Sequence, residues 1–68
     1  MSVAPGVTDR LSMELRELTE RLTKLQAFME SSGFISLSPE ARHLLYSQEV
    51  VMQMYEQILQ QRLMLMAS

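Results

Sequence analysis

Residues 8–31 read TDRLSMELRELTERLTKLQAFMES, and this stretch decides the fold. Its apolar side chains recur at alternating spacings of four and three residues, the heptad pattern of a helix with one apolar stripe. They are Leu11, Leu15, Leu18, Leu22, Leu25 and Met29. Thr8 is a suitable N-cap, and Asp9 places a negative charge in the first turn. We therefore expect a helix over about residues 9–31, ended by Gly33 in a left-handed C′ position.

A second helix is expected over about residues 39–66, after a linker that folds back onto the helices. Ser38-Pro39-Glu40 supplies an N-cap, a proline at the first helical position and an acid in the first turn. Two apolar rows follow. One comprises Leu44, Val51, Tyr55, Ile58 and Leu65, and the other Leu45, Met52, Leu59 and Met66. Because one partner helix can bury only one row, the other row needs a further partner.

Association with other copies is also favoured by the size of the chain. A chain of 68 residues builds only a marginal core. It has no cysteine to form disulfides and a single histidine to bind a metal, so neither can stabilise the fold. The sequence therefore predicts an all-α, two-helix antiparallel hairpin that assembles into a dimeric four-helix bundle or a larger helical oligomer. The predicted oligomer core comprises Leu11, Leu15, Leu18, Leu22, Leu25, Leu44, Leu45, Val51, Met52, Ile58 and Leu59. Residues 1–7 are expected to form a flexible arm, and residues 8–68 a single domain.

Composition argues against several classes of function. The net charge is −2, with basic and acidic residues interleaved, so the sequence indicates neither nucleic-acid nor anionic-membrane binding. No signal peptide or membrane-spanning run is evident, and we expect a soluble, cytoplasmic protein. The sequence has no cysteine nucleophile and only two glycines, and His43 has no serine and acid at a triad-like spacing. We therefore expect no enzymatic activity, no metal site and no cofactor.

Three residues of the second helix stand out as candidates for ligand binding. Gln48 and Arg62 occupy positions of the first apolar row that would otherwise be apolar. A polar residue in such a row can fix the register of an oligomer, line a polar site, or lie at the rim with its charge in water. Tyr55 lies on nearly the same face. A guanidinium and an aromatic ring on one face suit the phosphate and base of a nucleotide, although a tyrosine in a helical core is equally consistent with the pattern.

The first turns of the second helix and its methionines offer weaker candidates. Arg42 and His43 stand near a helix N-terminus, where an anion can bind, or they form an ordinary solvated pair. Tyr46 follows within one turn. The methionines could form an adaptable groove for a partner or fill gaps in an oligomer core. They are Met52, Met54, Met64 and Met66.

The order of these residues resembles a small family of uncharacterised helical proteins of tailed phages and prophages, related to a crAss-like phage protein. The resemblance covers about residues 10–63 and is carried by three short motifs. The first is R-x-x-K-L with an aromatic or apolar residue three positions on, the second is L-L-x-x-Q, and the third is M-x-x-Y followed by a leucine and an arginine. The matching residues are Arg21, Lys24, Leu25 and Phe28, then Leu44, Leu45 and Gln48, then Met52, Tyr55, Leu59 and Arg62.

This resemblance implies a phage protein acting in the cytoplasm of an infected or lysogenic bacterium. One hypothesis is a non-enzymatic homo-oligomer that sequesters a cyclic or ADP-ribose-derived nucleotide immune signal at subunit interfaces. Its site would use Tyr55 and Arg62, with Gln48, Arg42 and Tyr46. The alternative is an inhibitor or adaptor that presents an apolar helix face to a host defence or replication protein. A helical accessory of phage replication or recombination is the third reading.

Overall fold

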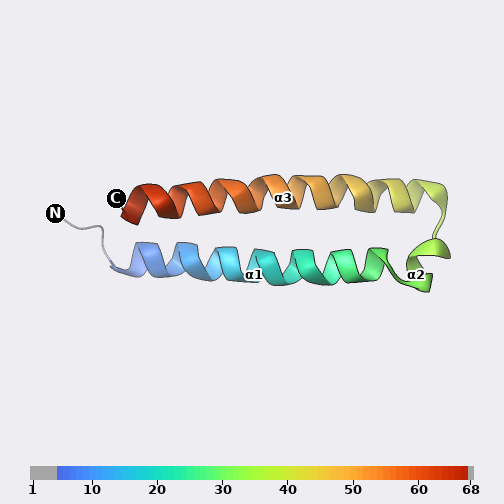
Figure 1. The fold of residues 1–68 in the computed structure, drawn as a ribbon, viewed down its shortest axis with the longest axis horizontal. Coiled ribbons are helices and arrows are strands. Elements are labelled where there is room, and N and C mark those ends of the chain that lie inside the picture. The colour runs from blue at the N-terminus through green and yellow to red at the C-terminus, as the bar shows by residue number, and fades with distance from the viewer. Residues whose placement is uncertain (1–4, 68) are drawn as a thin grey trace.

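The computed structural model describes residues 5–67 of the chain, and all three of its elements are helices. They are α1 (Pro5–Met29), α2 (Ser32–Ile35) and α3 (Pro39–Ala67). Figure 1 shows α1 and α3 lying side by side and antiparallel, with the short α2 at the turn between them. The expected all-α antiparallel hairpin is confirmed.

The first helix begins earlier than the sequence pattern predicts. Residues Pro5–Val7, expected in the flexible arm, already belong to α1, and Thr8 lies within the helix rather than capping it. Proline is tolerated in a first helical turn because the N–H that it lacks would have no partner inside the helix. The rest of the expected arm, residues 1–4, lies outside the described residues.

The core of the hairpin is one layer of apolar side chains between α1 and α3. Leu11, Leu18 and Leu22 of α1 are buried, and Leu59 of α3 is 0% exposed. Half-buried apolar residues pack around the cluster formed by Leu11, Leu18 and Leu59. They are Leu15, Met52, Leu63 and Met66. The stripe of α1 and the second row of α3 therefore bury each other, as their spacing predicts.

Phe34 anchors the turn between the two long helices. Its ring is buried and makes edge-to-face contacts with Phe28 of α1, at 6.4 Å between centroids, and with Tyr46 of α3, at 5.4 Å. Edge-to-face pairs at these separations stabilise a fold beyond the area they bury. The linker thus folds back onto the helices, as expected, and its residues 32–35 form α2.

Gly33 has a different role from the expected one. No described residue has a positive φ, and Gly33 lies inside α2 instead of in a left-handed C′ position. A Cβ atom at Gly33 would lie 3.2 Å from Cε1 of Phe28. The absence of a side chain at Gly33 therefore allows the Phe28 ring to approach α2 closely.

Ser38 caps α3 as the sequence predicts. The backbone N–H of Ala41 donates to Oγ of Ser38 at 3.1 Å, which satisfies one of the N–H groups left without a partner at the start of a helix.

Replacing this cap provides a first test of the fold. We expect Ser38→Ala to lower the free energy of unfolding by about 1 kcal/mol, the usual value of a serine N-cap. Ser47→Ala, at an exposed position inside α3, is the matched control and should change stability by less than about 0.5 kcal/mol. Urea unfolding followed by circular dichroism measures both variants, and equal stabilities would contradict the cap.

Candidate functional site

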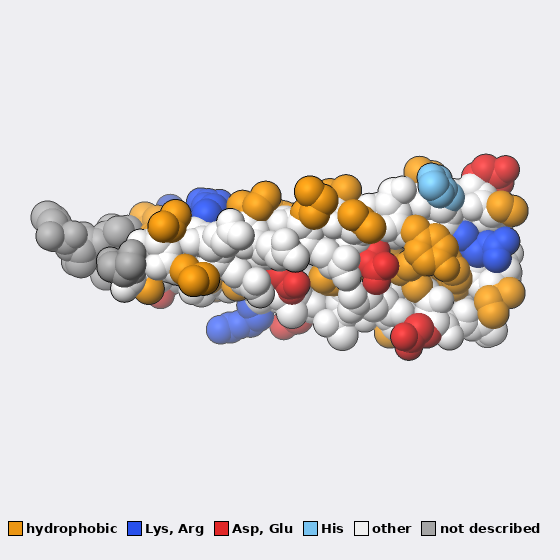
Figure 2. All heavy atoms as spheres, turned by 45° about the horizontal axis from the view of Figure 1, so that its top comes forward, with side chains coloured by type: hydrophobic (Ala, Val, Ile, Leu, Met, Phe, Trp, Pro, Cys, Tyr) orange, Lys and Arg blue, Asp and Glu red, His pale blue; other side chains and the backbone are white. Residues whose placement is uncertain are grey.

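The first apolar row of α3, together with the polar residues at its spacing, lies on a face that α1 does not cover. Its spacing is again four and three, and we call it the outer row. It comprises Leu44, Gln48, Val51, Tyr55, Ile58, Arg62 and Leu65. Every member is exposed, and the exposed fraction of its apolar and aromatic members ranges from 40% at Tyr55 to 76% at Leu65. Figure 2 shows hydrophobic side chains gathered along the α3 side of the molecule.

The outer row carries polar groups at two matched positions. Gln48 lies seven residues before Tyr55, and Arg62 lies seven residues after it. Nε2 of Gln48 donates a long hydrogen bond of 3.8 Å to Sδ of Met52 in the next turn. Arg62 is exposed on the same row. An amide, a phenol and a guanidinium therefore lie in line on an apolar surface, which suits a ligand with both aromatic and anionic parts.

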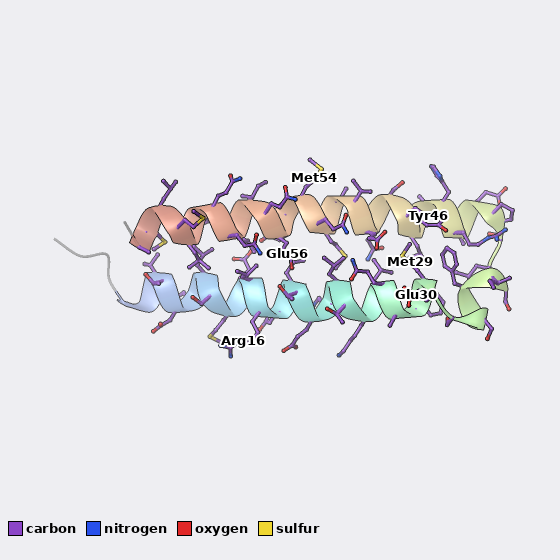
Figure 3. The ribbon with its side chains drawn as sticks, viewed as in Figure 1. Arg16, Met29, Glu30, Tyr46, Met54 and Glu56 are labelled. Atoms are coloured by element: carbon purple, nitrogen blue, oxygen red, sulfur yellow. The ribbon has the colours of Figure 1, made fainter. Side chains whose placement is uncertain are left out.

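Arg42 and Tyr46, the other two predicted site residues, lie together at the α2 end of the hairpin. They line an open depression of about 250 Å³ together with Pro39 and His43. Nε of Arg42 is buried without a hydrogen-bond partner, and Tyr46 is held by the Phe34 ring. Figure 3 shows Tyr46 at this end of α3. The depression combines a guanidinium with an aromatic ring and is a secondary candidate for an anionic ligand.

Within one chain, the five predicted residues do not form a single site. Arg42 and Arg62 are twenty residues apart, which is roughly 30 Å along a helix. Tyr46 and Tyr55 are nine residues apart, and nine residues turn an α-helix by roughly 180°. The structure therefore separates the depression at Arg42 and Tyr46 from the outer row that carries Gln48, Tyr55 and Arg62.

Sequence reasoning missed two features of α3 that hold the helices in place. Glu56 lies between α1 and α3, as Figure 3 shows, and its carboxylate accepts a hydrogen bond of 2.8 Å from Oγ1 of Thr19. Glu49, one heptad earlier, is also half-buried. Both follow the spacing of the row through Leu45, Met52 and Leu59 that packs against α1, which we call the inner row. This spacing was the signal available in the sequence. The second feature is the contact between Phe34 and Tyr46, for which spacing gives no signal.

Two kinds of feature are absent from the described residues. They contain no helix that could cross a membrane. They also contain no group of three or more histidine, cysteine, aspartate or glutamate residues that could hold a metal ion.

These observations define a small helical hairpin with an exposed, partly polar face on α3. The family model named Sequestin matches residues 5–65, and the chain belongs to the Sequestin family. No curated protein and no solved structure matches the chain. The family name is consistent with a sequestering, binding role.

Proposed function

We propose that this chain is a phage-encoded protein that forms homo-oligomers and sequesters a nucleotide-derived immune signal of the host at its subunit interfaces. Membership of the Sequestin family carries the sequestering part of the proposal. The outer row supports the rest, because it presents Gln48, Tyr55 and Arg62 on an apolar surface that needs covering. The ligand class is a cyclic or ADP-ribose-derived nucleotide, and the site of action is the cytoplasm of the infected or lysogenic bacterium.

The chemistry of the three side chains fits such a ligand. The guanidinium of Arg62 presents a fork of N–H donors that matches the oxygens of a phosphate. The ring of Tyr55 can stack on a base, which binds any nucleobase through its π-face. The amide of Gln48 both donates and accepts hydrogen bonds. No covalent chemistry is required, since sequestration only needs the complex to be stable.

Native mass spectrometry of the protein purified from cells tests the proposal most directly. The spectrum is recorded with and without a panel of cyclic and ADP-ribose-derived nucleotides. We expect a defined oligomer that carries a nucleotide at a fixed ratio. A stable monomer, or an oligomer that retains no nucleotide of the panel, would contradict the proposal.

Arg62→Ala provides the corresponding test on a single residue. Loss of a hydrogen-bonded charge pair should weaken nucleotide binding by about 10- to 100-fold. Arg16→Ala is the matched control, because Arg16 is exposed on α1 and points away from α3 in Figure 3. Isothermal titration calorimetry compares the two variants with the unchanged chain. Equal affinities of all three would exclude Arg62 from the site.

A specific observation supports a second candidate function, an inhibitor or adaptor that binds a host protein. Met54 and Met64 are exposed, at 58% and 71%, and neither belongs to the outer row. Exposed methionines suit a surface that adapts to a partner protein. Met66, by contrast, packs on the core of the hairpin and does not contribute to such a surface. An oligomer of defined size that binds no nucleotide of the panel would favour this function over sequestration.

A further inference from the structure

The outer row of α3 reads almost the same in both directions. Tyr55 stands at its centre, Gln48 and Arg62 lie seven residues on either side, and apolar residues fill the remaining positions. These apolar residues are Leu44 and Val51 before the centre, and Ile58 and Leu65 after it. A row with this symmetry matches a second copy of itself that runs in the opposite direction, since apolar positions then meet apolar ones and polar positions meet polar ones.

The charge on Arg62 favours an antiparallel arrangement of the two copies over a parallel one. In a parallel pair, Arg62 of one copy would lie beside Arg62 of the other, and two like charges in one interface repel. In an antiparallel pair centred near Tyr55, each Arg62 comes within about one helical turn, roughly 6 Å, of Gln48 of the other copy. The amide oxygen of that glutamine can accept from the guanidinium.

The charge content of α3 agrees with a covered face. Between Leu44 and Ala67 the helix has three charged residues, of which Glu49 and Glu56 are half-buried beside α1. Arg62 is thus the single charged residue left on the exposed surface of this segment. Few charges and many apolar side chains are the composition of the centre of a protein interface.

The exposure of the row itself also agrees with a second copy. Five of its seven residues are large apolar or aromatic side chains, and all five are at least 40% exposed in the single chain. A continuous exposed row of such side chains is typical of a surface that another protein covers.

We infer that two copies pair antiparallel through their outer rows, and that the nucleotide sites are shared between the copies. Each site takes Gln48 from one copy and Arg62 from the other, and the Tyr55 rings lie seven residues away, roughly 10 Å along the helices. Within one chain, Gln48 and Arg62 are fourteen residues apart, roughly 21 Å, so one chain alone cannot present both to one nucleotide. Each dimer offers two such sites. The shared site rests on the proposed function, whereas the pairing does not.

Cross-linking tests the pairing without any ligand. The chain has no cysteine, so Leu44→Cys and Leu65→Cys each introduce one thiol at opposite ends of the outer row. With a short bismaleimide, we expect a cross-linked dimer from a mixture of the two variants and none from either variant alone. In the antiparallel pair, two Leu44 positions lie roughly 30 Å apart. A dimer from Leu44→Cys alone would show a parallel pair, and no dimer from the mixture would exclude pairing through this row.

Complementation tests whether the site is shared. Gln48→Ala and Arg62→Ala each damage both sites of a dimer of identical copies. A mixed dimer, in which Leu44→Cys carries Arg62→Ala and Leu65→Cys carries Gln48→Ala, keeps one intact site. With ADP-ribose as the probe, we expect the cross-linked mixed dimer to bind one nucleotide, half the capacity of the cross-linked dimer without alanine substitutions. No recovery would place each site within one copy.

The two experiments separate the failure of this inference from the failure of the proposed function. If the two cysteine variants without alanine substitutions cross-link as expected but their dimer does not bind ADP-ribose, the shared ADP-ribose site is refuted and the pairing stands. If these variants bind ADP-ribose but their mixture does not cross-link, the pairing is refuted and sequestration stands.

Discussion

Leu59→Ala is expected to lower the free energy of unfolding by about 2–5 kcal/mol, the range for leucine-to-alanine changes in cores. Leu59 is the largest fully buried side chain among the described residues and lies in one cluster with Leu11 and Leu18. A two-helix hairpin has few neighbouring side chains that can move into the resulting cavity. Because a chain below about 70 residues rarely gains more than about 3–5 kcal/mol from its core, this substitution removes most of the stability of the hairpin.

Urea unfolding followed by circular dichroism measures this loss. Met64→Ala is the control, because it also truncates an apolar side chain of α3 but at a position that is 71% exposed and belongs to neither row. Its effect should stay within about 0.5 kcal/mol. Both variants are measured at two protein concentrations, since association stabilises the folded state by mass action. Equal losses for the two variants would show that the layer centred on Leu59 does not hold the hairpin together.

The helices of this chain are predictable from its sequence because their signals are local. The start of α3 at Pro39 follows from a serine cap and a proline at the first helical position, and the stripe of α1 follows from spacing alone. The turn is less predictable. Gly33 suggests a left-handed helix end, yet the packing of Phe34 between Phe28 and Tyr46 holds residues 32–35 in a further helical turn. Contacts between distant residues override a local preference here.

The candidate site also combines features that local spacing predicts with features that it does not. Spacing alone identifies the outer row and its two polar members, Gln48 and Arg62, because a period of four and three is visible in one dimension. It does not place Arg42 relative to that row, and the structure puts Arg42 in a depression at the α2 end. Nor does the spacing of Glu56, which matches the inner row, show that its carboxylate accepts a hydrogen bond from Thr19. Such distinctions require the partner helix to be in place.

Val51→Glu is expected to weaken self-association by about 100-fold or more. Val51 lies in the middle of the outer row and is 64% exposed in the single chain, so a glutamate there is readily solvated in a monomer. In the antiparallel dimer, the two copies would place two glutamates near the centre of one apolar interface. Burying a carboxylate without a partner costs several kcal/mol, and about 2.7 kcal/mol already corresponds to a factor of 100. Sedimentation velocity over a range of protein concentrations measures the shift.

Gln57→Glu separates this effect from that of charge alone. It adds the same carboxylate to α3 at an exposed position outside both rows, and it should leave the association constant unchanged. Circular dichroism shows whether the Val51→Glu chain keeps its helices once it dissociates. A helical monomer would mean that the inner layer around Leu59 suffices for folding, and an unfolded chain would mean that folding depends on the outer row as well. Unchanged sedimentation of Val51→Glu would mean that the outer row is not where copies of this chain meet.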